Sequence, residues 1–135
     1  LAMSLGSRLH QAGIRPSAQR LAIADYVLQT DHHPSADRVY DEVRSRVPMV
    51  SRATVYNTLN LFVDKGLLRR FYITDGRVAF DCNTAPHHHL VDETGAVHDI
   101  SPRDLRVEGV ADLQDFDVHD VHVVLHGRRR EPERA

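Results

Sequence analysis

The stretch of sequence that decides the fold is residues 51–66, Ser-Arg-Ala-Thr-Val-Tyr-Asn-Thr-Leu-Asn-Leu-Phe-Val-Asp-Lys-Gly. Ser51 is a typical helix N-cap, and Gly66 stands where the C-cap of the same helix belongs. The apolar residues between these caps recur at the spacing of one buried helical face: Ala53, Val55, Leu59, Phe62 and Val63. The stretch therefore predicts one amphipathic helix.

Three shorter helices are predicted upstream of this one. Residues 7–12 form a brief amphipathic stretch. Ser17 is expected to cap a second helix, which ends near residues 31–34. Ser35 then caps a third helix, and Pro48 ends it because proline cannot continue a helix.

A β-hairpin is predicted downstream. Residues 67–73 have the pattern of a strand, residues 74–77 that of a turn, and residues 78–80 that of the returning strand. Three helices followed by a hairpin are the layout of a winged helix-turn-helix, here with one extra helix in front. In this motif the last helix enters the DNA major groove with its early residues at the base edges.

The early residues of the helix over 51–66 suit that role. Arg52, Tyr56 and Asn57 lie on its polar side, where arginine can read guanine and tyrosine can pack on a thymine methyl group. The hydroxyls of Ser51 and Thr54 suit contacts with the DNA backbone. The alternative is that these residues are only the solvated face of an amphipathic helix. The order of helices and wing favours DNA contact.

A second informative stretch reads Phe-Asp-Cys-Asn-Thr-Ala-Pro-His-His-His and ends at His89. In an extended chain His87 and His89 point to one face and His88 to the other. Asp81 or Asp99 could complete a pocket with the first two histidines. Imidazole and carboxylate ligands suit iron, zinc or manganese, and the lack of thiolate favours iron or manganese. The alternative is a solvated polar turn that is rich in histidine.

The composition is that of an ordinary soluble protein. The chain has 135 residues, 41% of them hydrophobic and 27% charged, enough for one ordinary domain or two very small ones. No run approaches the roughly 20 apolar residues that a membrane helix needs. Cys82 is the only cysteine, which excludes an intrachain disulfide and a structural zinc site built on several cysteines. A cytoplasmic protein is therefore expected.

The net charge of −2 conceals two halves of opposite sign. Residues 1–80 carry 11 Lys and Arg against 7 Asp and Glu, whereas residues 81–135 carry 6 against 12 and hold seven of the ten histidines. The first half could approach a polyanion, and the second half could hold cations.

Several of these motifs together resemble the ferric uptake regulator family. They are residues 51–59, Gly66-Leu67, Phe80-Asp81 and the histidines 87–89, joined by residues 13–20 and 33–36. The likeness runs from about residue 5 to residue 127, nearly the whole chain. It implies an α+β fold, with an N-terminal winged helix-turn-helix DNA-binding domain over residues 1–80 and a C-terminal α/β dimerisation and metal-sensing domain over residues 81–135.

The resemblance also implies what the protein does. Members of the family are DNA-binding transcriptional regulators in which a divalent metal between two domains controls operator binding. A homodimer on an A·T-rich, pseudo-palindromic operator is expected, with no membrane partner. Arg15 matches the family's basic residue that enters the minor groove, and Arg20, in the first turn of the second helix, joins it as a candidate DNA contact.

The regulatory metal site of the family maps onto five residues of this chain: His33, Asp81, His87, His89 and Asp99. The resemblance adds His33 to the four found from the residues alone. The alternative for His33 is a histidine at the C-terminus of a helix, where it favours the helix dipole. Three imidazoles and two carboxylates suit Fe(II) or Mn(II), with Zn(II) as a further option.

Two details bear on the subgroup. Aspartate at position 81 resembles peroxide-sensing regulators, in which the histidines matching His33 and His87 are oxidised when Fe(II) is bound. Residues 92–95, Asp-Glu-Thr-Gly, replace the first Cys-x-x-Cys pair of typical members, and no cysteine follows Gly127. No four-cysteine structural zinc is therefore expected, as in the iron response regulators of alphaproteobacteria. The resemblance implies a peroxide-sensing repressor, with an iron-, manganese- or zinc-responsive repressor as the alternative.

Two further hypotheses remain open. A second metal site in the dimerisation domain could use His88, Glu108, His119 and His122, unless these residues are a solvated strand face. Two histidines and a carboxylate also resemble the triad of non-haem iron oxygenases. The small size and the winged-helix half favour a regulator, which is not an enzyme and has no catalytic residues.

Overall fold

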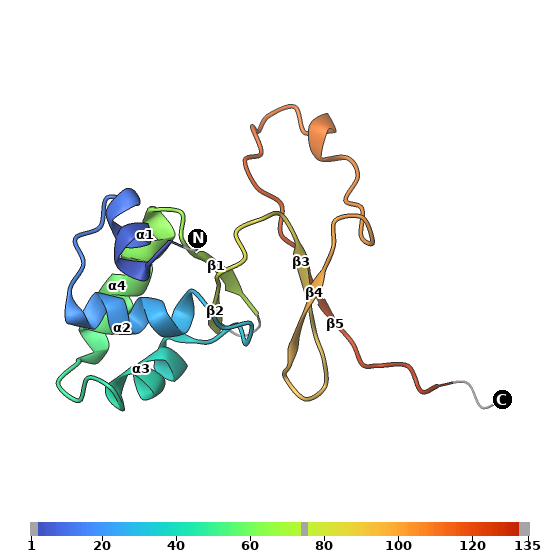
Figure 1. Ribbon diagram of the computed structural model, residues 1–135. Helices are drawn as coiled ribbons and strands as arrows, with labels where there is room; N and C mark the ends of the chain where they lie inside the picture. Colours follow the sequence, from blue (N-terminus) through green and yellow to red (C-terminus); the bar gives the residue numbers. More distant parts are fainter. Residues whose placement is uncertain (1–2, 74–75, 133–135) are drawn as a thin grey trace. The chain divides into compact units, whose positions relative to one another are not determined.

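The computed structural model describes residues 3–73 and 76–132 (Figure 1). The chain divides into a first unit, Leu1–Thr84, and a second unit, Ala85–Ala135. The division falls after Thr84 and not after residue 80, the boundary predicted from the sequence. The reason is that Asp81 still belongs to a strand of the first unit, and the Sγ atom of Cys82 lies 3.2 Å from the carbonyl oxygen of Thr30 in the same unit.

The first unit opens with four helices. They are α1 (Leu5–Gln11), α2 (Ala18–Val27), α3 (Ala36–Arg44) and α4 (Arg52–Asp64). Each begins after a serine whose hydroxyl oxygen accepts a backbone N–H from the first turn, at 3.0–3.2 Å. This confirms the caps predicted at Ser17, Ser35 and Ser51. Within the described ranges, no helix has the length and apolarity required to span a lipid bilayer.

The buried faces of these helices form the core of the first unit. It includes Leu9, Ile23, Val27, Val39, Val43, Val55, Leu59 and Phe62. The prediction that Ala53 is buried was wrong, because this residue lies in the first turn of α4 and is exposed. Gly66 follows the end of α4 with φ of 78°, the left-handed conformation expected of a glycine after a helix.

A β-hairpin completes the first unit as the predicted wing. Strands β1 (Arg69–Tyr72) and β2 (Val78–Asp81) pair antiparallel, with Arg69 opposite Asp81. The predicted turn includes Thr74 and Asp75, which lie outside the described residues. The N–H of Phe80 donates to the carbonyl oxygen of Pro34 at 2.9 Å, so β2 is tied to the segment between α2 and α3.

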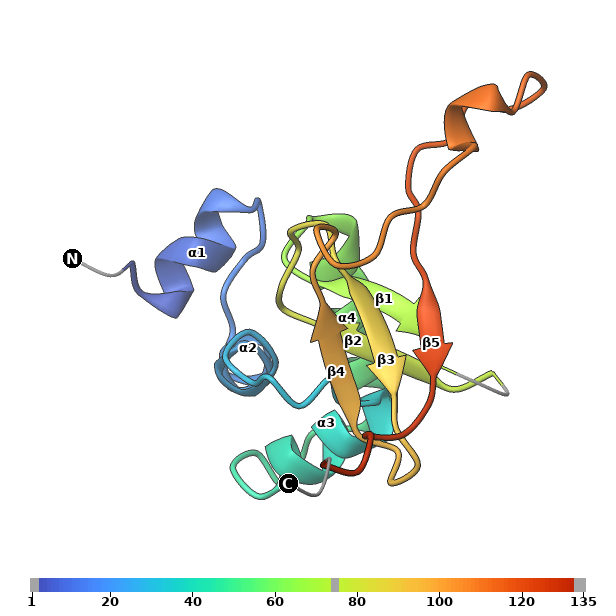
Figure 2. The ribbon, with the colours of Figure 1, turned by 90° about the vertical axis from the view of Figure 1, so that its right-hand side faces the viewer.

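The second unit is a three-stranded sheet of β3 (His88–Val91), β4 (Val97–Ile100) and β5 (Val124–His126). Figure 2 shows β3 in the middle, antiparallel to β4 and parallel to β5. The long connection from β4 to β5 carries a short 3-10 helix, η1 (Val110–Asp112), which is the helical element of residues 85–132. Gly109, with φ of 85°, precedes it. The α+β fold predicted from the sequence is confirmed.

Candidate metal centre and DNA-binding surface

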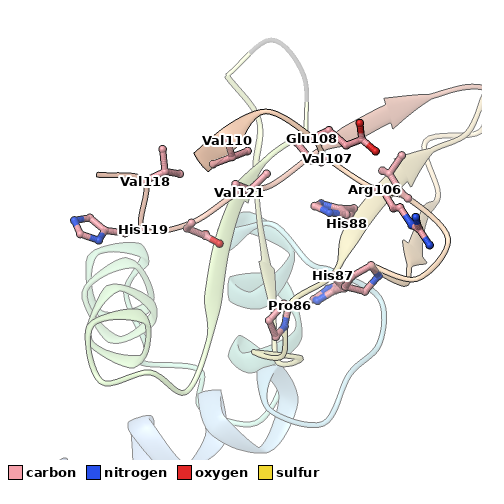
Figure 3. Close-up of a pocket in the computed structure, with 13 residues that line it drawn as sticks. Pro86, His87, His88, Arg106, Val107, Glu108, Val110, Val118, His119 and Val121 are labelled. Carbon is pink, nitrogen blue, oxygen red and sulfur yellow. The ribbon is translucent and has the colours of Figure 1, made fainter. Parts of the chain in front are cut away.

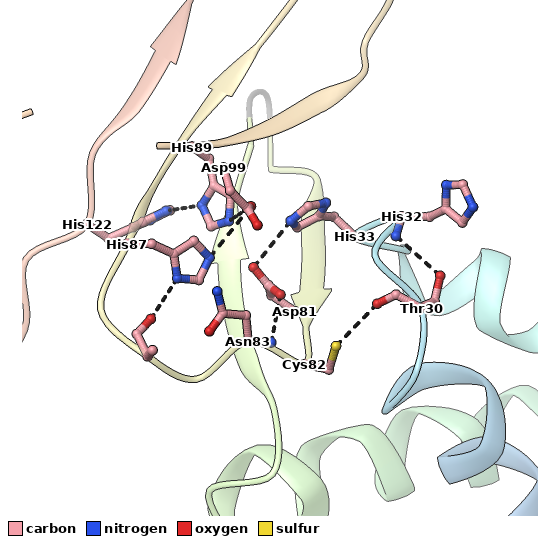
Figure 4. A network of polar contacts seen from close by, with 11 residues as sticks. Thr30, His32, His33, Asp81, Cys82, Asn83, His87, His89, Asp99 and His122 are labelled. Carbon is pink, nitrogen blue, oxygen red and sulfur yellow. Dashed lines mark hydrogen bonds and ion pairs between the residues drawn. The ribbon is translucent and has the colours of Figure 1, made fainter. Parts of the chain in front are cut away.

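His33 and Asp81 form a buried pair in the first unit, called here the first donor pair. The Nε2 atom of His33 lies 3.3 Å from Oδ2 of Asp81, and each side chain is 6% exposed. The other carboxylate oxygen of Asp81 accepts the N–H of Asn83 at 2.9 Å. Figure 4 shows that Asp81 and His33 point toward each other from β2 and from the segment before α3. The bond between Phe80 and Pro34 brings these two segments together.

The sequence predicts that His33 lies at the end of the second helix. This prediction is wrong. Helix α2 ends at Val27, and the N–H of its C-cap, Leu28, already bonds to the carbonyl oxygens of the preceding turn. His33 has φ of 53°, in the left-handed region that residues other than glycine rarely adopt. Because Pro34 follows, the right-handed helical conformation is disfavoured for His33. A favourable contact with a helix dipole therefore does not explain this residue.

Cys82 is held away from the first donor pair. Its thiol points to the carbonyl oxygen of Thr30, and its side chain packs against the core of the first unit. Burial raises the pKa of the Cys82 thiol, with the negative charge of Asp81 adding to the effect. A thiol that stays protonated is a weak nucleophile, which favours packing over redox sensing.

His87, His89 and Asp99 form a second donor group, within the second unit. The Nε2 atoms of His87 and His89 lie 3.7 and 3.5 Å from Oδ1 of Asp99. The sheet register sets Asp99 opposite His89, and the two imidazole rings are 4.5 Å apart between centroids. The predicted alternation of the histidines is confirmed: His87 and His89 share these contacts, whereas Nδ1 of His88 accepts the N–H of Val123 at 3.0 Å.

The separations within the two donor sets fit ligands of a metal ion. Nitrogen–oxygen distances of 3.3–3.7 Å exceed those of good hydrogen bonds, about 2.7–3.2 Å. Two ligands that are each about 2.1 Å from one ion are about 3.0 Å apart at a right angle and about 3.6 Å apart at an angle of about 120°. The donors are imidazole and carboxylate only, a chemistry that suits Fe(II), Mn(II) or Zn(II).

The residues predicted for a second metal site do not all lie together. His88, Glu108 and His119 line an open hollow of about 590 Å³ in the second unit, along with Arg106 and Val121 (Figure 3). His122 instead contacts His89, with 2.6 Å between Nε2 of His122 and Nδ1 of His89. His122 thus belongs with the second donor group, and the hollow retains three of the four predicted residues.

The turn between β3 and β4 is held by Asp92, where the sequence resemblance places the first cysteine pair of typical ferric uptake regulators. One oxygen of its carboxylate accepts the N–H groups of Thr94 and Ala96 at 2.8 and 3.2 Å. The other oxygen lies 2.6 Å from Nε2 of His98. The hydrogen bond from His98, followed by those from Thr94, holds the pKa of Asp92 well below its usual value. A carboxylate network therefore closes this hairpin.

The predicted DNA-contact residues of α4 differ in how they are held. Tyr56 is 48% exposed, and Asn57 is exposed as well. Nη1 of Arg52 lies 2.7 Å from Oδ1 of Asp37, and its guanidinium stacks 4.4 Å from the ring centroid of Tyr40. Both partners of Arg52 come from α3.

The remaining predicted DNA contacts lie at helix starts. The hydroxyl of Ser51 donates to that of Thr54 at 3.0 Å, so both side chains also serve the cap of α4. Arg15 is exposed, and Nη1 of Arg20 donates to its carbonyl oxygen at 2.8 Å. Arg20 thereby holds the arm that carries Arg15.

Comparison with known sequences identifies the family. The profile of the ferric uptake regulator family matches residues 11–126. The chain belongs to this family. Its members are metal-responsive DNA-binding dimers and not enzymes, with an N-terminal DNA-binding domain and a C-terminal dimerisation domain.

Individual relatives of the ferric uptake regulator family agree along nearly the whole chain. The peroxide-responsive repressor PerR of Staphylococcus aureus (strain Mu50) is 35% identical over 122 residues, which are 88% of this chain and 82% of that protein. The ferric uptake regulator of Vibrio cholerae has a TM-score of 0.73 at 28% identity, covering 92% of this chain and 98% of that one. The Pseudomonas aeruginosa regulator solved with manganese has a TM-score of 0.69 at 26% identity, covering 96% and 100%.

Two sets of contacts in this family member are not predicted from the sequence. Asp37 and Tyr40 were not linked to Arg52, and His122 was not linked to His89. The spacing of Asp37 and Tyr40, three residues apart on one helix, indicates a shared face but not the residue that it meets. No sequence signal pairs His122 with His89, because the face of each strand residue depends on the register.

Proposed function

We propose that this protein is a metal-dependent repressor of transcription that senses peroxide through the oxidation of histidine. The proposal is supported by its likeness to a peroxide-responsive repressor and by aspartate at position 81, where plain iron sensors more usually carry glutamate. The cytoplasm is the expected location, because the ligand is double-stranded DNA.

The observation that carries the proposal is the pair of thiolate-free donor sets, one in each unit. We propose that one Fe(II) or Mn(II) ion takes ligands from both sets: His33, Asp81, His87, His89 and Asp99. An ion held by both units would fix the angle between them. Since the first unit carries α4, the helix proposed to bind DNA, metal binding would then control affinity for the operator.

The chain is proposed to bind DNA as a homodimer on an A·T-rich, pseudo-palindromic operator, as the family likeness implies. Residues 1–80 would supply the DNA contacts and residues 81–135 the dimer contacts. Arg52, Tyr56 and Asn57 of α4 would reach the major groove. Arg15 would enter the minor groove, whose negative potential is strongest in narrow A·T tracts.

Bound Fe(II) supplies the reducing centre at which hydrogen peroxide is activated. In the overall step, one oxygen atom of peroxide enters a carbon–hydrogen bond of an imidazole ring, and the other oxygen leaves as water. The ring loses two electrons, and peroxide gains them. We propose His33 or His87 as the ring oxidised. The modified ring is a poorer ligand, so the metal and the DNA would both be released.

An iron-, manganese- or zinc-responsive repressor without peroxide sensing is the second candidate. The structural likeness to a regulator solved with manganese favours it, and the same nitrogen and oxygen donors accept all three ions. Zn(II) and Mn(II) do not readily reduce peroxide, so the bound ion would decide which behaviour the protein has.

The test compares two metal forms of the same protein. Anaerobically purified protein is loaded with Fe(II) or Mn(II), and a DNA site is selected from a random library with the Mn(II) form. Micromolar peroxide should release DNA from the Fe(II) form only and add one oxygen atom to a peptide that contains His33 or His87. If the Fe(II) form stays on its DNA with unmodified histidines, the second candidate is the better one.

A further inference from the structure

We infer that His122 is a positioning residue of the metal centre. Its ring accepts a hydrogen bond from His89 and thereby orients His89 as a metal ligand. This inference rests on the proposed function, since it assumes that His89 binds the metal. It gives a role to a histidine that sequence reasoning grouped with His88, Glu108 and His119.

The contact between the two imidazoles is close and specific. Nδ1 of His89 lies 2.6 Å from Nε2 of His122, and the rings meet edge to face with centroids 4.9 Å apart. Figure 4 shows His122 on the side of His89 away from Asp99. His89 is therefore held at both ring nitrogens, because its Nε2 atom faces Asp99 at 3.5 Å.

The position of the proton follows from the role of His89. A neutral imidazole that offers the lone pair of Nε2 to a metal carries its proton on Nδ1. The short contact then requires His122 to accept that proton's hydrogen bond at Nε2 and to carry its own proton on Nδ1. Metal-ligating histidines commonly donate their second N–H in this way, which fixes the ring and raises its basicity.

The distance also separates this role from direct ligation. Two nitrogen ligands of one ion, each about 2.1 Å from it, are about 3.0 Å or more apart. The separation of 2.6 Å is shorter than that and lies just below the usual range of N–H hydrogen bonds, about 2.7–3.2 Å. Because the gap is too small for two ligands of one ion, His122 acts through His89.

The backbone of the sheet sets the place of His122. The N–H of His89 donates to the carbonyl oxygen of Val123, and the N–H of Val123 donates to the ring of His88, both at 3.0 Å. The parallel pairing of β3 with β5 then begins with His89 beside Val124. The residue before Val123 is thus fixed next to His89 before any metal binds.

The experiment measures Mn(II) affinity and a hydrogen-bond signal in matched variants. His122→Phe removes the acceptor, and His122→Gln keeps one at a similar reach. His126→Phe is the control, because it is an exposed histidine on β5 that pairs with Val91 and is not among the residues that line the hollow. His89→Ala tests the metal centre itself. In Zn(II)-loaded protein labelled with ¹⁵N at histidine, NMR should detect a coupling across the N–H···N bond.

His122→Phe should weaken Mn(II) binding by about 10- to 100-fold, the usual loss when a ligating histidine loses its hydrogen-bond partner. It should also abolish the coupling. His122→Gln should recover most of the affinity, and His126→Phe should match the wild type in both measurements. Wild-type Mn(II) affinity in the anaerobic His122→Phe protein, or the absence of the coupling in the wild-type protein, would overturn the inference. The inference would also fail if His122→Gln bound Mn(II) as weakly as His122→Phe does. If His89→Ala binds Mn(II) like the wild type, the proposed metal centre fails instead.

Discussion

The pairing of Arg52 with Asp37 makes a two-sided prediction about DNA affinity. In the free protein, Arg52 is bonded to the Asp37 carboxylate and stacked on the Tyr40 ring. A guanidinium that reads a base edge must give up at least part of the bond to Asp37. Arg52→Ala should therefore weaken operator binding, whereas Asp37→Asn should strengthen it.

The magnitudes follow from the exposure of the pair. The side chains of Arg52 and Asp37 are 57% and 68% exposed, so their bond is a surface ion pair worth about 0.2–1 kcal/mol. A good bidentate contact from arginine to a base contributes about 1–3 kcal/mol. The net loss in Arg52→Ala is then at most about 2.8 kcal/mol, and from the middle of both ranges it is about 1.4 kcal/mol, roughly tenfold in Kd. Asp37→Asn should tighten binding by roughly 1.4- to 5-fold.

The assay is fluorescence anisotropy with the Mn(II)-loaded protein, on the selected site and on random DNA of the same length. Metal content should be unchanged in both variants, since neither residue belongs to a donor set. The double variant should bind like Arg52→Ala if Asp37 acts through Arg52. Weaker operator binding by Asp37→Asn would refute the reasoning, because it would mean that Asp37 orients Arg52 in the complex. If Asp37→Asn tightened binding to random DNA by the same factor, the loss of one negative charge alone would explain the effect.

Four further outcomes are expected. Arg15→Ala should lose most affinity on A·T-rich sites, and an equal loss on all DNA measured by the same anisotropy assay would contradict a minor-groove role. EDTA should abolish tight DNA binding yet leave a folded dimer without structural zinc, as judged by circular dichroism, sedimentation and metal analysis. Asp81→Glu should keep metal-dependent DNA binding but slow the reaction with peroxide, as measured by mass spectrometry. The reason is that the longer side chain can reach around the metal and fill the position that peroxide needs. Because hydrogen bonds hold the pKa of Asp92 below its usual value of 3.8, stability from this turn should be present above about pH 4 and lost as the pH falls further. Urea unfolding of metal-free protein should show that loss, and Asp92→Asn should lack that part of the acid dependence.

The helices of the first unit could be predicted because their signals are local. A serine cap and a recurring apolar face lie within one stretch of chain, as at Ser51 and Val55, and the structure keeps both. The end of α2 could not be predicted in this way. The sequence stays compatible with a helix up to Pro34, but the chain leaves the helix at Leu28 and turns twice before His33. Helix ends depend on what the following residues can bond to, and here the segment before α3 bonds to β2.

The candidate metal centre could be predicted where alternation along one strand decides which side chains meet. His87 and His89 share a face because they are two residues apart, and Asp99 joins them once the β3–β4 register is fixed. The contact of His33 with Asp81 spans 48 positions and depends on the bond between Phe80 and Pro34. The face taken by His122 depends on how β5 pairs with β3, and a shift of one residue would turn it away.

The hydrogen bonds of Asp92 explain how the second donor group can hold its geometry without the cysteines of a structural zinc site. Asp99 lies beside His89 only while Val91 pairs with Val97 and Leu90 with His98. Asp92 fixes this register from both sides, since one oxygen holds the turn at Thr94 and Ala96 and the other contacts His98 on β4. A slip by one residue would move Asp99 to the opposite face of the sheet. In this chain the contact between the Asp92 carboxylate and His98 therefore holds the hairpin, as a cysteine-bound metal would. His98 directly precedes Asp99, which is a proposed metal ligand.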